Sequence, residues 1–240
     1  MNVNAVITGE ESTETRDGTA VSILWTDLNE SPREFPRCAL GLFPESEVRR
    51  IGRFIREADR RLRYAAVSLL TDLVGGLPGI VSGVFIDRNR SGRPQILGVE
   101  HADISVSHSG EIVVCALSTR GRIGIDIELI RPVDIDDFIR VFPASLWEWF
   151  HTDDASGAVK PMSVVERFFH AWTRLESVIK AHGEGLSSPL GDFVFDDRRA
   201  LLGSETWRLH TIPVSDGYVC SMAVCGTINR IDIHRATCLK

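Results

Sequence analysis

Three strand-like segments follow one another closely between residues 103 and 129 of the chain. They read DISVSHS (103–109), EIVVCALS (111–118) and RIGIDIEL (122–129). Each is rich in β-branched residues, which is typical of strands, and the Ser-Gly and Arg-Gly steps between them are typical of tight turns. The run predicts three consecutive strands, which fixes a sheet in the middle of the chain.

Helical patterns lie on both sides of this run. Apolar residues recur at spacings of three and four over residues 45–74, and a second long helix is expected from about 161 to 182. Short helical patterns lie at 135–142 and 143–150. Further strands are predicted at 21–28, 38–43 and 80–87, and the alternating tail indicates an antiparallel sheet that finishes the second half.

The resulting prediction is an α+β fold in two lobes of similar size. A polar lead-in occupies residues 1–20, an N-terminal lobe residues 21–118, and a C-terminal lobe residues 119–240. Each lobe combines a few strands with a long helix, and the two lobes join near residues 100–120.

Composition excludes several classes of protein. The 240 residues contain no apolar run near the roughly 18 to 20 residues that a membrane helix requires, and the acidic N-terminus lacks the pattern of a secretory signal. A net charge of −6 argues against a nucleic-acid-binding protein. Five cysteines without CxxC pairing indicate reduced structural thiols. We therefore expect a cytoplasmic protein that binds neither membranes nor nucleic acids.

Two carboxylates in the segment 122–129 are the first candidates for chemistry. Side chains alternate along a strand, so Asp126 and Glu128 share one face, while Gly124 lets a backbone or a ligand approach closely. An all-oxygen donor set of this kind suits Mg²⁺, or Mn²⁺, better than zinc. The alternative interpretation is an amphipathic strand whose acidic face lies in water.

A third acid lies on the second long helix. Trp172, Glu176 and Lys180 are spaced by four residues and so share one helix face. Glu176 is positioned to complete a metal site with the two strand acids, and Lys180 to contact a diphosphate. The alternative is an ordinary Glu–Lys pair on the surface.

The turn SVSHSG (105–110) adds Ser107 and His108, and we interpret the histidine as a donor to phosphate. Basic residues come from the first long helix, at Arg60, Arg61 and Arg63, and from Arg93 in the SGRP turn. The chain has no GxSxG, GxGxxG or GxxxxGK[ST] motif. A serine hydrolase, a Rossmann site and a P-loop are therefore disfavoured.

Taken together, SVSHSG, the later GIDIE and the still later WTRLESVIKAHGEGL resemble the Sfp-type 4′-phosphopantetheinyl transferases in order and spacing. The resemblance implies two α/β lobes related by a pseudo-twofold axis, with coenzyme A and Mg²⁺ in the cleft between them. It also implies transfer of the phosphopantetheine arm to a serine of an apo acyl or peptidyl carrier protein, with release of 3′,5′-ADP. Such enzymes activate carriers of fatty-acid and secondary-metabolite biosynthesis.

Carried over residue by residue, the resemblance implies three metal ligands, namely Asp126, Glu128 and Glu176. Catalysis would fall to Glu176, as acceptor of the serine proton, and to Lys180, which contacts the diphosphate and assists the leaving group. Contacts to coenzyme A would come from Arg61, Arg93, Ser107, His108 and Lys180. A single chain that supplies both lobes is sufficient as a monomer.

One position departs from the family pattern. Leu175 stands where a lysine usually precedes the motif glutamate, and Arg174 is no automatic substitute because adjacent helix positions point about 100° apart. The aromatic segment 138–150 forms either a docking surface for the carrier or plain core packing. Two other functions remain open: another Mg²⁺-dependent phosphoryl-transfer or nucleotide-cleaving enzyme, and a catalytically weak module that binds carrier proteins and coenzyme A.

Overall fold

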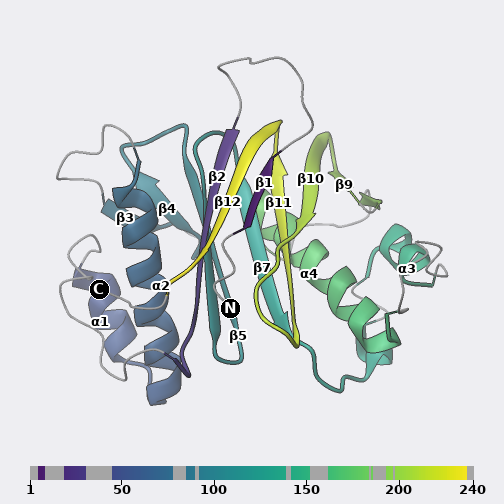
Figure 1. Cartoon of the computed structure of the whole chain (residues 1–240), viewed down its shortest axis with the longest axis horizontal. Helices are drawn as coiled ribbons and strands as arrows, with labels where there is room; N and C mark the ends of the chain where they lie inside the picture. Colours follow the sequence, from purple (N-terminus) through teal and green to yellow (C-terminus); the bar gives the residue numbers. More distant parts are fainter. Residues whose placement is uncertain are drawn as a thin grey trace.

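Two five-stranded sheets form the centre of the protein (Figure 1). The computed structural model describes residues 5–8, 19–30, 45–77, 85–89, 92–138, 142–151, 162–183, 185, 193–196 and 198–236. The first sheet has the strand order β1 (Ala5–Thr8), β12 (Ile228–Arg235), β2 (Thr19–Asp27), β6 (Ile112–Ser118) and β5 (Asp103–Ser109). The second has the order β7 (Ile123–Leu129), β11 (Tyr218–Cys225), β10 (Glu205–Thr211), β9 (Arg199–Leu202) and β8 (Val194–Phe195).

Helices cover the outer faces of both sheets. Figure 1 shows α2 (Glu57–Gly75) beside the first sheet and α4 (Val164–His182) beside the second, with the strands between them. The remaining elements are α1 (Glu45–Gly52), a short hairpin of β3 (Phe85–Arg88) and β4 (Pro94–Leu97), the 3₁₀ turn η2 (Ile135–Phe138) and α3 (Ala144–His151). The predicted α+β class is confirmed.

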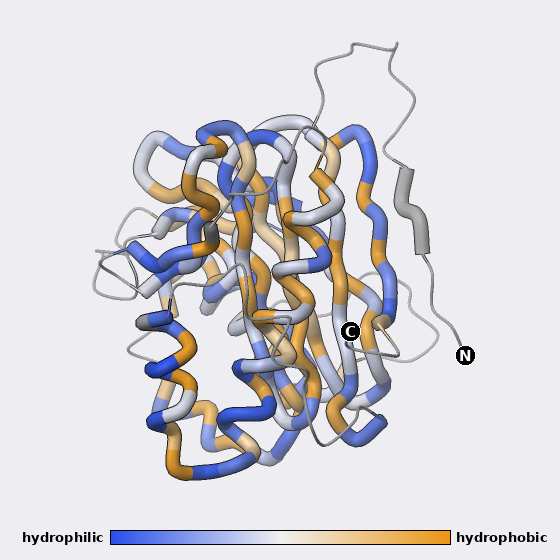
Figure 2. Tube along the Cα trace, turned by 90° about the vertical axis from the view of Figure 1, so that its left-hand side faces the viewer, coloured by the Kyte–Doolittle hydropathy of each residue, from blue (hydrophilic) through white to orange (hydrophobic). Residues whose placement is uncertain are grey.

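Three apolar clusters hold these layers together. The middle cluster joins the two sheets and includes Ile23 and Trp25 of the first and Ile125 and Met222 of the second. The outer clusters lie between α2 and the first sheet, and between the second sheet and the helices α3 and α4. Figure 2 shows the hydrophobic segments concentrated in the central strands. All seven residues of β6 are buried, because this strand is covered on both faces.

Helix α4 has well-defined ends, which fixes the position of the residues it carries. At its N-terminus the Ser163 side chain accepts a hydrogen bond from the Glu166 backbone, while the Glu166 side chain accepts one from the Ser163 backbone. At its C-terminus Gly183 adopts the left-handed conformation at φ 90°.

No helix in the described ranges is long and apolar enough to cross a membrane.

The prediction of a single helix over 45–74 is wrong in one respect, because residues 53–56 are not helical and divide it into two helices. Helix α1 ends at Gly52, a poor helix former, and α2 begins after Arg56, which is extended at ψ 129°. Arg60 Nη1 donates to the carbonyls of Phe54 and Ile55 and so stabilises the intervening turn. Ile55, one of the apolar residues in the pattern that predicted this helix, is 94% exposed.

The predicted tail sheet also requires a correction. Strand β12 does not join the second sheet but pairs in parallel with β2 of the first, with Ile233 opposite Ile23. Short strands β4 and β9 were not predicted, whereas β5, β6 and β7 lie where the sequence placed them. The strand predicted at 38–43 lies outside the described residues.

Candidate active site

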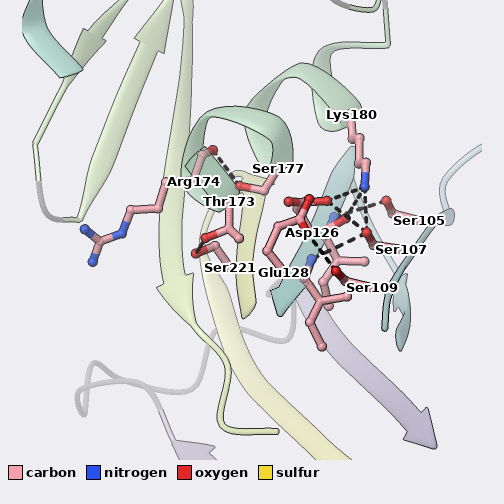
Figure 3. Close-up of polar contacts among 12 residues, drawn as sticks. Ser105, Ser107, Ser109, Asp126, Glu128, Thr173, Arg174, Ser177, Lys180 and Ser221 are labelled. Atoms are coloured by element: carbon pink, nitrogen blue, oxygen red, sulfur yellow. Dashed lines mark hydrogen bonds and ion pairs between the residues drawn. The ribbon is translucent and has the colours of Figure 1, made fainter. Parts of the chain in front are cut away.

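The site is built where strand β5 of the first sheet runs beside strand β7 of the second. The two strands form no backbone ladder; instead the hydroxyls of three alternate serines on β5 accept hydrogen bonds from backbone N–H groups of β7. Ser105 accepts from Ile125 at 3.1 Å, Ser107 from Ile127 at 3.4 Å, and Ser109 from Leu129 at 3.0 Å. We call these three residues the serine row, and Figure 3 shows them along one side of the site.

Strand β7 presents its two acids to this row. Its isoleucines at 123, 125 and 127 pack into the cluster between the sheets, so Asp126 and Glu128 project from the opposite face. Ser107 donates to Asp126 Oδ1 at 2.8 Å, and Ser109 donates to Glu128 Oε2 at 2.8 Å. The shared face predicted from strand alternation is therefore present.

Lys180 of α4 enters the same cluster. Its Nζ lies 2.6 Å from Asp126 Oδ1 and 2.9 Å from Ser107 Oγ (Figure 3). Asp126 is only 4% exposed, and this ion pair compensates for the burial of its charge. The second oxygen, Asp126 Oδ2, is buried and has no hydrogen-bond partner among the described residues.

Close contact between α4 and β7 sets the distance between their functional side chains. A Cβ at Gly124 would lie 1.9 Å from the carbonyl oxygen of Ser177 and 2.5 Å from the amide nitrogen of Ala181. The approaching group expected at this glycine is thus the backbone of α4. Glycine is required there because any side chain would displace the helix.

Burial and mutual repulsion act on the two remaining acids. Burial, followed by the charge of Asp126, raises the pKa of Glu176, and Lys180 opposes this shift. Burial also raises the pKa of Glu128, together with the charge of Asp126, while the hydrogen bond from Ser109 acts in the opposite direction. The burial and mutual repulsion of these carboxylates cost free energy that a bound cation would relieve.

A pocket of about 580 Å³ opens over these groups. Asp126, Glu128 and Glu176 line it together with Trp172 and Lys180, so one face of α4 does point into the site as the spacing predicted. Its basic lining is provided by four charged residues, Arg63, Arg88, Arg93 and Lys180, and by His108. Partial burial, then the charges of Arg63 and Lys180, lower the pKa of His108, so the imidazole is mainly neutral at pH 7 and donates without a charge.

The arginines occupy different positions from those the sequence indicated. Arg61 does not line the pocket; its Nη2 donates to the Leu28 carbonyl at 2.8 Å. Arg63 lines the pocket instead, with its guanidinium carbon 5.0 Å from the centre of the Phe54 ring. Arg88, which sequence reasoning missed, also reaches the pocket and is bound by Glu47 at 2.9 Å. No sequence signal distinguished Arg88 from the other arginines of its turn.

Arg93 lines the pocket but is largely engaged by the protein. Two of its nitrogens bind the carboxylate of Asp103 at 2.9 and 2.5 Å. It also donates to the backbone carbonyls of Lys180 and Ile123, each at 2.8 Å. Arg93 therefore ties β5, β7 and the end of α4 together.

The departure at Leu175 is explained by its position. Leu175 is fully buried in the cluster beneath α4, so this position faces the core and not the pocket. Arg174 points away from the acids in Figure 3, with its guanidinium carbon 4.9 Å from the centre of the Trp149 ring. Neither residue lines the pocket.

The aromatic segment contributes mainly to the core. Phe142, Leu146 and Phe150 are at most 7% exposed, and Phe142 stacks on Phe168 of α4 with ring centres 5.6 Å apart. Of the two interpretations of residues 138–150, the described part favours core packing. Only residues 139–141 of that segment lie outside the described ranges.

Comparison with known proteins shows which class of protein this chain is similar to. Residues 122–223 match the model of the 4′-phosphopantetheinyl transferase superfamily. A 4′-phosphopantetheinyl transferase of Bacillus subtilis is 31% identical over 151 residues, 60% of this chain and 63% of the relative. The 4′-phosphopantetheinyl transferase Sfp of Bacillus subtilis (strain 168) is 34% identical over 102 residues, 42% of each chain. The 4′-phosphopantetheinyl transferase HetI of Nostoc is 27% identical over 220 residues, 85% of this chain and 87% of the relative.

Residues 122–223 are thus similar to the 4′-phosphopantetheinyl transferase superfamily, and the chain as a whole is similar to Sfp-type 4′-phosphopantetheinyl transferases. The alignments cover 63% of the length of the first relative and 42% of Sfp, less than two thirds in both cases.

Proposed function

We propose that the protein transfers the 4′-phosphopantetheine arm of coenzyme A to a serine of an apo acyl or peptidyl carrier protein and releases 3′,5′-ADP. The observation that carries this proposal is one pocket that combines cationic groups with three desolvated carboxylates. The cations suit the phosphates of coenzyme A. The carboxylates suit a divalent cation and a proton acceptor at the same place.

The arrangement of strands supports two lobes related by a pseudo-twofold axis, divided near residues 118–119. In the first sheet β2 pairs with β6, which pairs with β5; in the second β7 pairs with β11, which pairs with β10. Each set is antiparallel and each is covered by a long helix that follows its first strand in sequence. In this proposal β12 returns from the second lobe to the first, and the pocket lies between the lobes.

The residues present fit a divalent metal, with Mg²⁺ or Mn²⁺ as the ion. Asp126 has a buried oxygen without a hydrogen-bond partner in the described structure, and Glu128 and Glu176 are two further hard oxygen donors beside it. Among the described residues, no three His, Cys, Asp or Glu side chains lie together in an arrangement that could hold a metal ion. Asp126, Glu128 and Glu176 would hold the ion, which would neutralise phosphate charge there.

Each residue then has a defined task in the transfer. Arg63, Arg88 and His108 hold the phosphates of coenzyme A, and Arg93 ties β5, which carries His108, to β7 and to the end of α4. Glu176 accepts the hydroxyl proton of the carrier serine while the serine oxygen forms a bond to the β-phosphorus of coenzyme A. The bond to the bridging oxygen breaks, and Lys180 stabilises the negative charge that develops on departing 3′,5′-ADP. Positioning and charge neutralisation are sufficient, without an intermediate bound to the enzyme.

The wider setting follows from the same proposal. A single chain supplies every group of the site, so a monomer suffices, and the partners are coenzyme A and apo carrier domains of fatty-acid or secondary-metabolite synthesis. We place the reaction in the cytoplasm, where both are present.

The test is the release of 3′,5′-ADP in the presence of Mg²⁺, coenzyme A and an apo carrier protein. We expect one 3′,5′-ADP per carrier modified, and no release with a carrier whose acceptor serine is replaced by alanine. Release with the alanine carrier would instead indicate an enzyme that cleaves the nucleotide hydrolytically. Binding of coenzyme A without any release would indicate a binding module. Glu100→Gln, an exposed acid outside the pocket, is the matched control for Glu176→Gln.

A further inference from the structure

The serine row places hydroxyl groups directly against the two strand acids. Ser109 has one hydroxyl hydrogen, which it donates to Glu128 Oε2 at 2.8 Å, while its oxygen accepts from the Leu129 backbone at 3.0 Å. The β7 backbone thus fixes the hydroxyl on one side, and the hydroxyl fixes the carboxylate on the other. The orientation of Glu128 is therefore set by a residue of the other sheet.

Ser107 has the same double role beside Asp126. Its hydrogen goes to Asp126 Oδ1 at 2.8 Å, and its oxygen accepts from the Ile127 backbone at 3.4 Å and from Lys180 Nζ at 2.9 Å. All hydrogen-bonding capacity of this hydroxyl is in use. Ser107 can donate to a phosphate only by releasing Asp126, so a role in orienting the acid accounts for its contacts better.

Ser105 serves as an internal comparison. It accepts from the Ile125 backbone at 3.1 Å, as the other two accept from their partners on β7. The residue before Ile125 is Gly124, which has no side chain that could receive the hydrogen. Ser105 therefore links the two sheets without holding a carboxylate. Substitutions at Ser105 thus measure what this link between the sheets contributes by itself.

We propose that Ser107 and Ser109 are positioning residues that orient Asp126 and Glu128 for the divalent cation, with Ser109 dedicated to Glu128. This inference rests on the proposed function, because it concerns the same site. Groups that hydrogen-bond to metal ligands fix the direction of their lone pairs, and their loss commonly weakens metal binding about 10- to 100-fold. The serine row thus links the two sheets by hydrogen bonds, and two of its members also orient the acids of β7.

The test compares Ser109→Thr with Ser109→Val, two β-branched side chains of nearly equal size that differ by one hydroxyl. The same pair of substitutions at Ser105 is the matched control. The measurement is the dissociation constant of Mn²⁺ by titration calorimetry, without coenzyme A or carrier protein, together with the Tm of each variant. Steady-state kinetics then separate kcat from the apparent KM for Mg²⁺.

We expect Ser109→Val to bind Mn²⁺ at least about 10-fold more weakly than Ser109→Thr, with a matching rise in the apparent KM for Mg²⁺. The two Ser105 variants should bind Mn²⁺ equally, whatever their Tm values. Equal Mn²⁺ affinities for the two Ser109 variants would overturn the inference, and so would an equal loss in Ser105→Val or a wild-type protein that binds no Mn²⁺.

Failure of this inference can be distinguished from failure of the proposed function. A wild-type protein that modifies no carrier, but whose Mn²⁺ affinity depends on the Ser109 hydroxyl, would refute the function and leave the positioning role intact. Carrier modification with equal Mn²⁺ affinities for Ser109→Thr and Ser109→Val would refute the positioning role alone.

Discussion

Replacing Gly124 by alanine should uncouple the two halves of the site. The new Cβ would lie 1.9 Å from the Ser177 carbonyl oxygen, whereas real Cβ atoms essentially never come within 3.0 Å of such an atom, so α4 has to retreat by about 1.1 Å. All three of the nearest atoms to the new Cβ are backbone, so no side-chain rotation can relieve the clash. Overpacking of this kind costs about 1–3 kcal/mol of stability.

The displaced helix carries Glu176 and Lys180 away from the acids of β7. Misplacement of catalytic groups by about 1 Å lowers the rate on the order of 10²-fold. The assay is kcat/KM for carrier modification, with Tm measured by circular dichroism on the same preparation. We expect both quantities to fall in Gly124→Ala.

Gly75→Ala is the matched control, because a Cβ at Gly75 would meet nothing within 4 Å and the residue ends helix α2. Alanine is favoured over glycine in a helix by about 0.5–1 kcal/mol, so this variant should keep or gain stability with full activity. A Gly124→Ala protein with wild-type Tm and wild-type kcat/KM would refute the claim that contact between α4 and β7 sets the geometry of the site.

Three further substitutions test the electrostatics. Glu176→Gln should lose about 10²- to 10⁴-fold in kcat through removal of the proton acceptor. Because burial raises the pKa of Glu176, the folded state favours its protonated form and loses stability as the pH rises through that raised pKa. The metal-free Gln variant should therefore have a Tm at pH 7.5 equal to or above that of wild type, and a clearly lower Tm would contradict the shift. Lys180→Met leaves the buried Asp126 carboxylate without its ion-pair partner and should lower the free energy of unfolding, measured by urea denaturation, by about 1–3 kcal/mol, while an unchanged midpoint would argue against the ion pair. Burial lowers the pKa of His170 to about 4, so stability present above pH 6.5 is lost as the pH falls toward 4. A His170→Gln protein should show a shallower fall of Tm over that interval, and curves of equal slope would exclude this contribution.

Local periodicity predicted the acidic part of the site. Alternation along one strand was enough to place Asp126 and Glu128 on one face, and a spacing of four was enough to align Trp172, Glu176 and Lys180 along the pocket. Such relations hold within a single element, so they need no knowledge of how elements pack.

The positions of the arginines could not be predicted in this way. The helix is interrupted at residues 53–56, so one continuous helical register over 45–74 could not show which arginine faces the pocket. Arg61 donates to a backbone carbonyl just after β2, and Arg63 lines the pocket where Arg61 was expected. The engagement of Arg93 with Asp103 likewise depends on three elements that meet only in the folded chain.

Pairing between distant strands was also invisible in the sequence. Strand β12 alternates like its neighbours in the tail, yet it pairs with β2, more than 200 residues earlier. The serine row had a visible signal, three serines on alternate positions of β5, but its meaning required knowing that β7 runs beside it. Which side chains of β5 meet which residues of β7 depends on the register of the two strands, and this register is set only in the folded state.

The most direct test of the proposed function is the intact mass of an apo carrier protein after incubation with this protein, coenzyme A and Mg²⁺. The proposal predicts a gain of one phosphopantetheine arm, which is abolished by EDTA and by Glu176→Gln but retained in Glu100→Gln. An unchanged carrier mass across several carrier types, despite measurable binding of coenzyme A, would contradict it.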